Sequence, residues 1–145
     1  MIPVSQVLAN CQHQSQHGPP YRVGSCKLAV RLAYEVSVSH SGSAHAAWTQ
    51  AAHKHRLADP GAAPKGAPVF WSGGARGFGH VAVSAGNGRI WSTDIDRTGY
   101  FDLVPASAPA DQWGLVPLGW TNDLDGQIVY QEKPMPKRPN FDAIY

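Results

Sequence analysis

The chain has 145 residues, 43% of them hydrophobic and 15% charged, which is typical of one folded globular domain and excludes a disordered protein. The formal net charge of +2 suits an anionic partner such as a bacterial cell wall but is too small to indicate nucleic-acid binding. No apolar run approaches the ~20 residues that a membrane span requires, so no membrane insertion is expected.

The first elements in chain order are predicted to be helices. Residues 3–11 predict a short helix, and the polar segment QHQSQHGPP after it predicts a loop. Ser25 is a plausible N-cap for a clearer second helix in CKLAVRLAYEV. Ser43 opens an Ala-rich third helix, SAHAAWTQAAHKHRL, over residues 43–57.

The rest of the chain reads as short strands. Alternating or β-branched runs between turn signals predict strands at 68–71, 80–85, 89–93, 100–104 and 127–130. Helices that precede a sheet indicate the α+β class, with N-terminal helices packed on a small antiparallel sheet. We expect one domain over residues 1–130 and a Pro-rich, basic tail or linker over 131–145.

Cys26 is the first candidate for chemistry. A thiol attacks as its thiolate, and the free N–H groups at the first turn of a helix favour an anion there. Gly24 allows a tight turn onto the helix and the close approach of a substrate. Free cysteine is also often a buried core residue. A disulfide with Cys11, the only other cysteine, would consume a nucleophile, so we expect none; the role of Cys11 stays open.

His80 and Asp94 are predicted to meet across a hairpin. His80 begins the first strand after the glycine-rich GGARGFG, and Asp94 lies near the end of the returning strand. A three-residue loop, Gly86–Gly88, sets His80 directly opposite Asp94, at a Cβ separation of ~5 Å. The carboxylate could then orient the imidazole as the third group of a Cys-His-acid arrangement. Asp96 is the substitute for Asp94 if the register differs.

Four segments resemble the CHAP-type amidohydrolase/peptidase domains, relatives of the NlpC/P60 cysteine peptidases. YRVGSC matches Y-x-x-G-x-C around the family's nucleophile, and GSAHAAW resembles its G-N-A-x-x-W stretch. PKGAPVFWSGGARGFGHVAV resembles the strand that leads to G-H-V-A, and RIWSTDI resembles the closing strand, with aspartate where glutamate is usual. The similarity spans roughly residues 20–96.

The resemblance implies a papain-like fold that hydrolyses an amide bond of peptidoglycan without a metal or other cofactor. The domain would be an N-acetylmuramoyl-L-alanine amidase or a peptide endopeptidase, as in phage endolysins, acting as a monomer. By the same resemblance Cys26 is the nucleophile, His80 the general base and then acid, Asp94 the orienting acid, and Tyr21 an aromatic whose hydroxyl assists the oxyanion. The start of the chain lacks the pattern of a signal peptide, so we expect synthesis in the cytoplasm and release by a holin, a secretion system or lysis.

Other interpretations stay open. The HKH segment (53–55) lies on a predicted helix, where residues i and i+2 do not face each other, so a metal site is disfavoured. Trp113, Trp120 and Asn122 could line a sugar or peptide groove, although tryptophan is as often core. An inactive wall-binding or phage structural module, and an intracellular thiol acyltransferase or deamidase, remain alternatives to the hydrolase.

Overall fold

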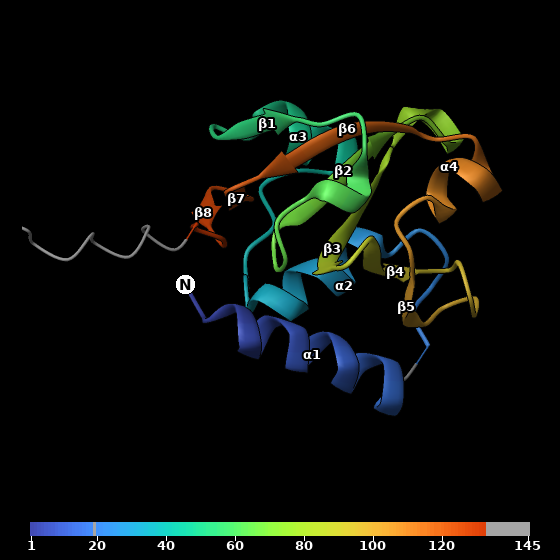
Figure 1. Cartoon of the computed structure of the whole chain (residues 1–145), viewed down its shortest axis with the longest axis horizontal. Helices are drawn as coiled ribbons and strands as arrows, with labels where there is room; N and C mark the ends of the chain where they lie inside the picture. Colours follow the sequence, from blue (N-terminus) through green and yellow to red (C-terminus); the bar gives the residue numbers. More distant parts are fainter. Residues whose placement is uncertain (19, 133–145) are drawn as a thin grey trace, which may run out of the picture.

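The computed structural model describes residues 1–18 and 20–132 (Figure 1). The helices are α1 (Val4–His17), α2 (Cys26–Tyr34), α3 (Ala44–Gln50) and α4 (Ala108–Trp113), with 3-10 turns η1 (Pro60–Ala62) and η2 (Ala75–Gly77). The strands are β1 (Lys54–Arg56), β2 (Pro68–Ser72), β3 (His80–Gly86), β4 (Arg89–Thr93), β5 (Phe101–Pro105), β6 (Val116–Thr121), β7 (Asp123–Leu124) and β8 (Gln127–Ile128).

Helices and an antiparallel sheet make up the structure, which confirms the predicted α+β class. The main sheet has the order β1-β6-β2-β3-β4-β5, and β7 and β8 form a separate hairpin. Four predicted strands correspond to β2–β5 with bounds that differ by at most one residue, whereas the predicted strand 127–130 is reduced to β8. Of the predicted tail, residues 133–145 lie outside the described residues. Within the described part of the chain, no helix has both the length and the apolarity to cross a bilayer.

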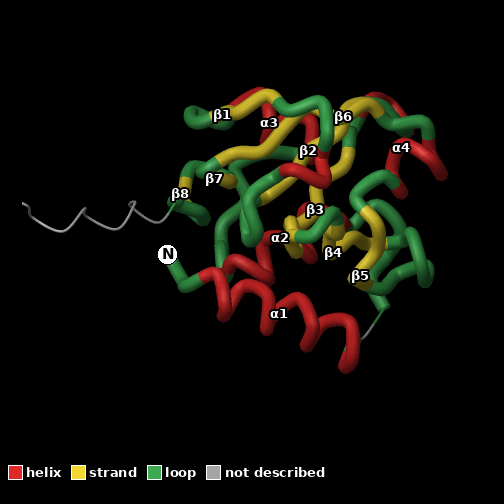
Figure 2. Tube along the Cα trace, in the orientation of Figure 1, coloured by secondary structure: helices red, strands yellow, loops and turns green. Residues whose placement is uncertain are grey.

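Each face of the sheet has its own apolar core, because successive side chains of a strand point to opposite faces. Phe70, Val81 and Val83 share one core with residues of α1, α2 and α3, and α1 lies below β3 and β4 in Figures 1 and 2. Trp91 also packs on this side, as the predicted hairpin register requires. The other face is covered by loop residues and by the segments around η1 and α4, and its core contains Ala63, Ala67, Val69, Trp71, Ala82, Ile90, Val104, Ala106, Leu115, Trp120 and Tyr130.

Helix α1 is longer than predicted, because the polar segment after residue 11 continues it. Val7 and Cys11, four residues apart, are fully buried on one face. Gln14 on the following turn donates from Nε2 to the carbonyl of Ala29 at 3.0 Å, so a polar side chain takes the place of an apolar contact with α2. The helix ends at Gly18, whose φ is +46°.

The predicted third helix is wrong beyond residue 50, where the chain turns into the edge strand β1. The carboxylate of Asp123 accepts hydrogen bonds from the backbone N–H groups of Ala52 and His53, at 2.8 and 3.0 Å. These bonds redirect the chain, and β1 then pairs with β6, a partner more than 60 residues later.

Strand β6 was not predicted, because Pro117 and Gly119 break its pattern. The pairing of β2 with β6 shifts register between Phe70 and Trp71, opposite Pro117, which cannot donate to the ladder. Gly119 has φ +145°, and a Cβ there would collide with the carbonyl oxygen of His55. The glycine is therefore what allows β1 to lie against β6.

The β3–β4 hairpin has the predicted register but not the predicted loop. Val83 pairs with Trp91 and Ser84 with Ile90, as the predicted register requires, but the pairing of β3 with β4 ends at Val83 and Trp91, before it reaches His80 and Asp94. The turn is nevertheless two residues, Asn87-Gly88, both with positive φ, as in a type I′ turn. A bulge between Ser84 and Gly86 adds one residue to β3, so the two-residue turn produces the same register as the predicted three-residue loop.

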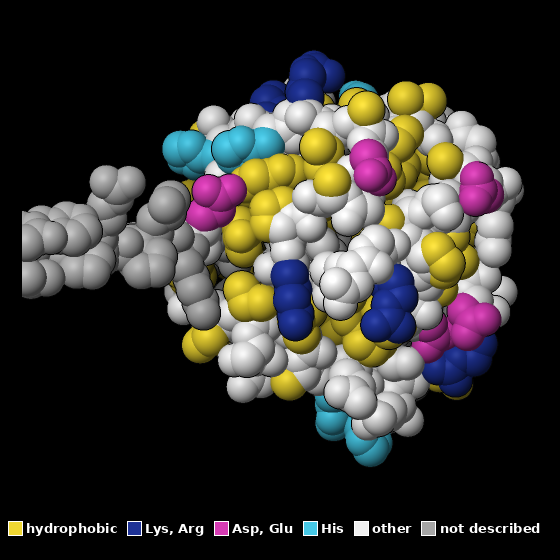
Figure 3. All heavy atoms as spheres, viewed as in Figure 1, with side chains coloured by type: hydrophobic (Ala, Val, Ile, Leu, Met, Phe, Trp, Pro, Cys, Tyr) yellow, Lys and Arg dark blue, Asp and Glu magenta, His cyan; other side chains and the backbone are white. Residues whose placement is uncertain are grey.

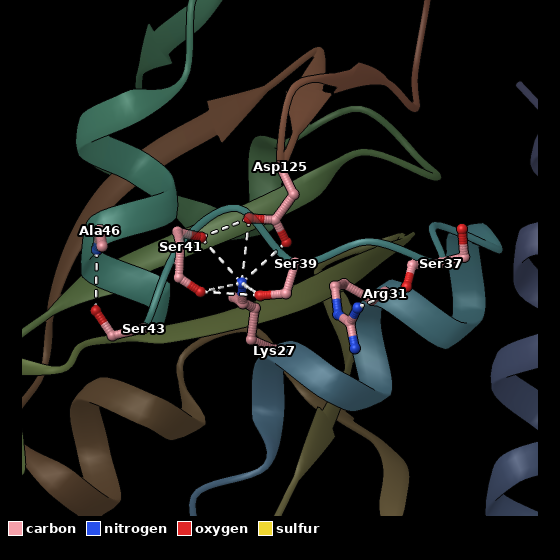
Figure 4. A network of polar contacts seen from close by, with 8 residues as sticks. All are labelled: Lys27, Arg31, Ser37, Ser39, Ser41, Ser43, Ala46 and Asp125. Carbon is pink, nitrogen blue, oxygen red and sulfur yellow. Dashed lines mark hydrogen bonds and ion pairs between the residues drawn. The ribbon is translucent and has the colours of Figure 1, made fainter.

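A buried ion pair joins α2 to the turn between β7 and β8 (Figure 4). The Nζ of Lys27 lies 2.9 Å from Oδ2 of Asp125, and the two side chains are 12% and 0% exposed. Nζ also donates to Oγ of Ser39 and to the carbonyl of Ser41, each at 2.6 Å, and the Ser41 hydroxyl donates to Asp125. The network holds residues 39–41 against α2.

On the face seen in Figure 3, by contrast, charged side chains are scattered among apolar atoms.

We expect the substitution Asp125→Ala to lower the free energy of unfolding by about 3 kcal/mol or more, because it leaves the ammonium of Lys27 buried without its counter-ion. Urea denaturation followed by circular dichroism measures this loss. Asp102→Ala is the matched control, since it leaves the guanidinium of Arg97, whose side chain is 49% exposed to water, without its partner. An equal or larger loss in the control would contradict the structural role of the Lys27–Asp125 pair.

Candidate functional site

One cavity of about 580 Å³ brings together four residues predicted from the sequence, Gly24, Cys26, His80 and Asp94. Cys26 comes from the start of α2 and His80 from the start of β3, while Asp94 directly follows β4. The packing of α2 against β3 and β4 therefore assembles residues that are up to 70 positions apart in the chain.

Cys26 is the first residue of α2, as predicted, although the Ser25 side chain makes no capping hydrogen bond. The residue is 8% exposed. Burial raises the pKa of the Cys26 thiol, and the negative charge of Asp94 acts in the same direction. Hydrogen bonds with the backbone of Val81 and Lys27 lower this pKa, so the sulfur lies beside the strand residue that follows His80.

The turn before Cys26 depends on Gly24. Its φ is +88°, and nothing lies within 4 Å of the place where a Cβ would be. Only glycine adopts this conformation freely, and the missing side chain leaves the cavity open beside the thiol. Both properties agree with the expectation from the sequence.

The imidazole of His80 is held by Ser92. Its Nε2 lies 2.7 Å from Oγ of Ser92, a fully buried residue. The Ser92 hydroxyl also lies 3.3 Å from the carbonyl oxygen of Thr93, which can only accept a hydrogen bond. With the hydroxyl proton donated to Thr93, Ser92 accepts from Nε2–H, and Nδ1 is the ring nitrogen with a lone pair for a proton.

Burial keeps His80 neutral. The residue is 5% exposed and lies between the rings of Trp71 and Trp113, at centroid distances of 5.7 and 5.3 Å. Burial lowers the pKa of His80 to about 4. Burial thus favours the neutral imidazole of His80 and the protonated thiol of Cys26.

Asp94 lines the cavity but does not orient the imidazole as expected. Its φ is +67°, which turns the side chain away from the pleat of β4. Oδ1 accepts from the backbone N–H of Gly99 at 2.6 Å, and Oδ2 accepts from that of Gly24 at 3.4 Å. The carboxylate of Asp94 therefore closes the loop 94–99 and contacts the turn before Cys26. The hydrogen bond at Nε2 of His80 is made with Ser92 instead.

Tyr21 and Asp96 lie outside this cavity. The Tyr21 hydroxyl donates to Oε1 of Gln14 at 2.6 Å, and Tyr21 is not among the residues that line the cavity. Asp96 lines a different cavity, with Val104 and Ser107, so it does not substitute for Asp94.

Ser92 and Thr93 are residues of the site that the sequence did not single out, whereas Trp113, a groove candidate from the sequence, lines the cavity. In the predicted register Ser92 is the diagonal neighbour of His80 on the same face, a relation that could have found it. Thr93 lines the cavity, and among the residues that the structure describes its buried hydroxyl has no hydrogen-bond partner. Trp113 is on α4, which joins the site only through the tertiary fold.

The remaining groove candidates, Trp120 and Asn122, lie together outside the Cys26 cavity and line another cavity with His55. Trp120 is buried and belongs to the second core, and the His55 ring stacks on it at a centroid distance of 3.9 Å. Oδ1 of Asn122 accepts a hydrogen bond from Nε2 of His55 at 2.6 Å. Cys11 is a fully buried free thiol, and Cys26 is also free. In the described part of the chain, no three histidine, cysteine or acidic residues are grouped as metal ligands.

A comparison with protein-family models finds no model that matches the chain, and a comparison with curated proteins finds no significant match. The function of this protein is therefore proposed from its own residues.

We expect His80 to make folding stability fall as the pH falls. In the unfolded chain a histidine has a pKa of about 6.5, and burial lowers that of the folded state to about 4. The unfolded state thus binds the proton first, and the contribution present above pH 6.5 is lost progressively down to pH 4, by about 3 kcal/mol.

Urea denaturation at pH 7.0, 5.5 and 4.5 measures this effect. The variant His80→Gln, which retains a nitrogen able to reach Ser92, is the control and should show a shallower loss. A wild-type slope equal to that of His80→Gln would show that His80 is not buried in its neutral form.

Proposed function

We propose that this protein is a cysteine hydrolase that cleaves an amide bond of bacterial peptidoglycan, on a papain-like domain of the CHAP type. The observation that carries the proposal is the shared cavity, in which a cysteine at the first turn of α2 meets a histidine at the start of β3. The order of cysteine before histidine and the motifs around each support the same family.

In the first half of the proposed reaction, the Cys26 thiol transfers its proton to Nδ1 of His80 as its sulfur attacks the carbonyl carbon. The backbone N–H groups at the start of α2 stabilise the oxyanion. The tetrahedral intermediate collapses, the C–N bond breaks, and the His80 imidazolium returns the proton to the leaving amine. A thioester on Cys26 remains.

In the second half, His80 takes a proton from a water molecule, which attacks the thioester. The C–S bond breaks, the carboxylic acid leaves, and the imidazolium returns its proton to the sulfur. Ser92 takes the place expected for the orienting acid, because it holds Nε2 through both halves. No metal or cofactor is needed for these steps.

The wall substrate requires that the protein reach the cell wall, and we propose that a holin, a secretion system or lysis releases it to act there as a monomer. A second candidate function is a catalytically inactive wall-binding or phage structural module. One observation favours this second candidate. Burial raises the pKa of Cys26 and lowers that of His80, so it disfavours the thiolate and the imidazolium that catalysis requires. A thiol acyltransferase or deamidase would use the same cysteine and histidine on a soluble substrate.

Turbidity clearing of purified cell walls tests the proposal. We expect the wild-type protein to clear the walls, and Cys26→Ala and His80→Ala to reduce the rate on the order of a thousandfold or more, because each removes a group that reacts. Circular dichroism controls for folding. Absence of clearing by the wild type, or clearing by Cys26→Ala, would refute a thiol mechanism on peptidoglycan, and mass analysis of the products names the bond that is cut.

Ser92→Ala and Asp94→Asn separate the two candidates for the residue that orients His80. We expect Ser92→Ala to lower kcat about tenfold to a hundredfold with little change in KM, because it removes a buried hydrogen bond to Nε2. Asp94→Asn keeps an oxygen for Gly99 and should lower kcat less. The opposite order would return the orienting role to Asp94.

A further inference from the structure

Lys27 and Asp94 both line the cavity, and of these two only Lys27 has a counter-ion among the described residues. Lys27 lines the cavity, but its ammonium is paired with Asp125 and held by Ser39 and Ser41. Figure 4 shows the Lys27 amine at the centre of these contacts, and the pair adds no net charge. Asp94 lines the same cavity, and within the described residues its carboxylate accepts only backbone N–H groups and makes no ion pair.

The remaining lining is apolar or neutral. Val23, Phe78 and Trp113 line the cavity although they are 73%, 52% and 40% exposed, so apolar surface is open to a ligand there.

We propose that the Cys26 cavity accepts uncharged, largely apolar acyl segments and excludes segments with a carboxylate, and that Asp94 is the residue that sets this selectivity. The inference rests on the proposed function for its substrate. It assigns the cleaved bond to a part of the wall peptide flanked by small neutral residues, away from free carboxylates.

The physical basis is Coulomb repulsion in a partly desolvated site. Two like charges that share a cavity of this size lie within several ångströms of each other, where the effective dielectric constant is well below that of water. An anionic segment would also lose its hydration without gaining a cation, because Lys27 is already occupied. A neutral segment avoids both costs and covers the exposed apolar rim.

Alkylation of Cys26 by a neutral and an anionic reagent of similar size tests the selectivity without any need for hydrolysis. The full chain is treated with iodoacetamide or iodoacetate at pH 8, and the labelled cysteine is identified by peptide mass mapping. Rates are divided by those of the same chain unfolded in urea, which removes the intrinsic difference between the reagents. We expect the normalised rate at Cys26 to favour iodoacetamide by about tenfold or more.

Asp94→Asn is the decisive variant, because asparagine tolerates a positive φ and keeps an acceptor for Gly99. We expect it to reduce the preference to about twofold or less. Asp96→Asn removes the same charge from a neighbouring residue that lines another cavity, and it should leave the preference unchanged. Besides the labelling of the wild type and of the two variants, a further experiment compares the hydrolysis of synthetic amides that differ only by a carboxylate next to the scissile bond.

A normalised preference below about threefold in the wild type would overturn the proposal, and so would a preference that Asp94→Asn leaves intact or that Asp96→Asn abolishes equally. Failure of the proposed function looks different, since walls would remain intact while the labelling preference and its loss in Asp94→Asn persist. In that case the selectivity stands, and it applies to the substrate of another thiol reaction.

Discussion

The packing of the first turn of α2 against the first residues of β3 is the interaction on which the site depends. It places the sulfur of Cys26 beside the backbone of Val81, one residue after His80, and removes both reactive groups from water. Burial shifts both pKa values toward the neutral forms. The helix terminus and the backbone hydrogen bonds oppose this shift for the thiolate, so the site balances desolvation against fixed dipoles.

Neutral resting groups have a consequence for how such a site would work. A thiolate formed only as the carbonyl arrives needs a base that is close, correctly oriented and unprotonated. Ser92 supplies the orientation without adding charge, since a hydroxyl holds Nε2 where a carboxylate was expected. The carboxylate of Asp94 instead closes the loop 94–99 and contacts the turn before Cys26.

The walls of the cavity are positioned by contacts distant from the thiol. Lys27 and Asp125 join α2, residues 39–41 and the β7–β8 turn, and residues 42–44 then form part of the cavity wall. Gly119 and the bulge at Phe70–Trp71 allow β6 to enter the sheet between β1 and β2. The sheet in turn supports α4, which carries Trp113 to the edge of the His80 ring.

The local pattern of the chain was sufficient for the α+β class, for Cys26 at the start of a helix, for β2–β5 and for the register that pairs Val83 with Trp91. These features depend on neighbouring residues, on periodicity and on turn chemistry, all of which are visible in one dimension. Tertiary contacts decided the rest. Pairing with β6 turned Lys54–Arg56 into a strand, contacts with α2 extended α1, and the positive φ of Asp94 directed its carboxylate to Gly24 and Gly99. Such outcomes depend on partners far along the chain, which local propensity does not contain.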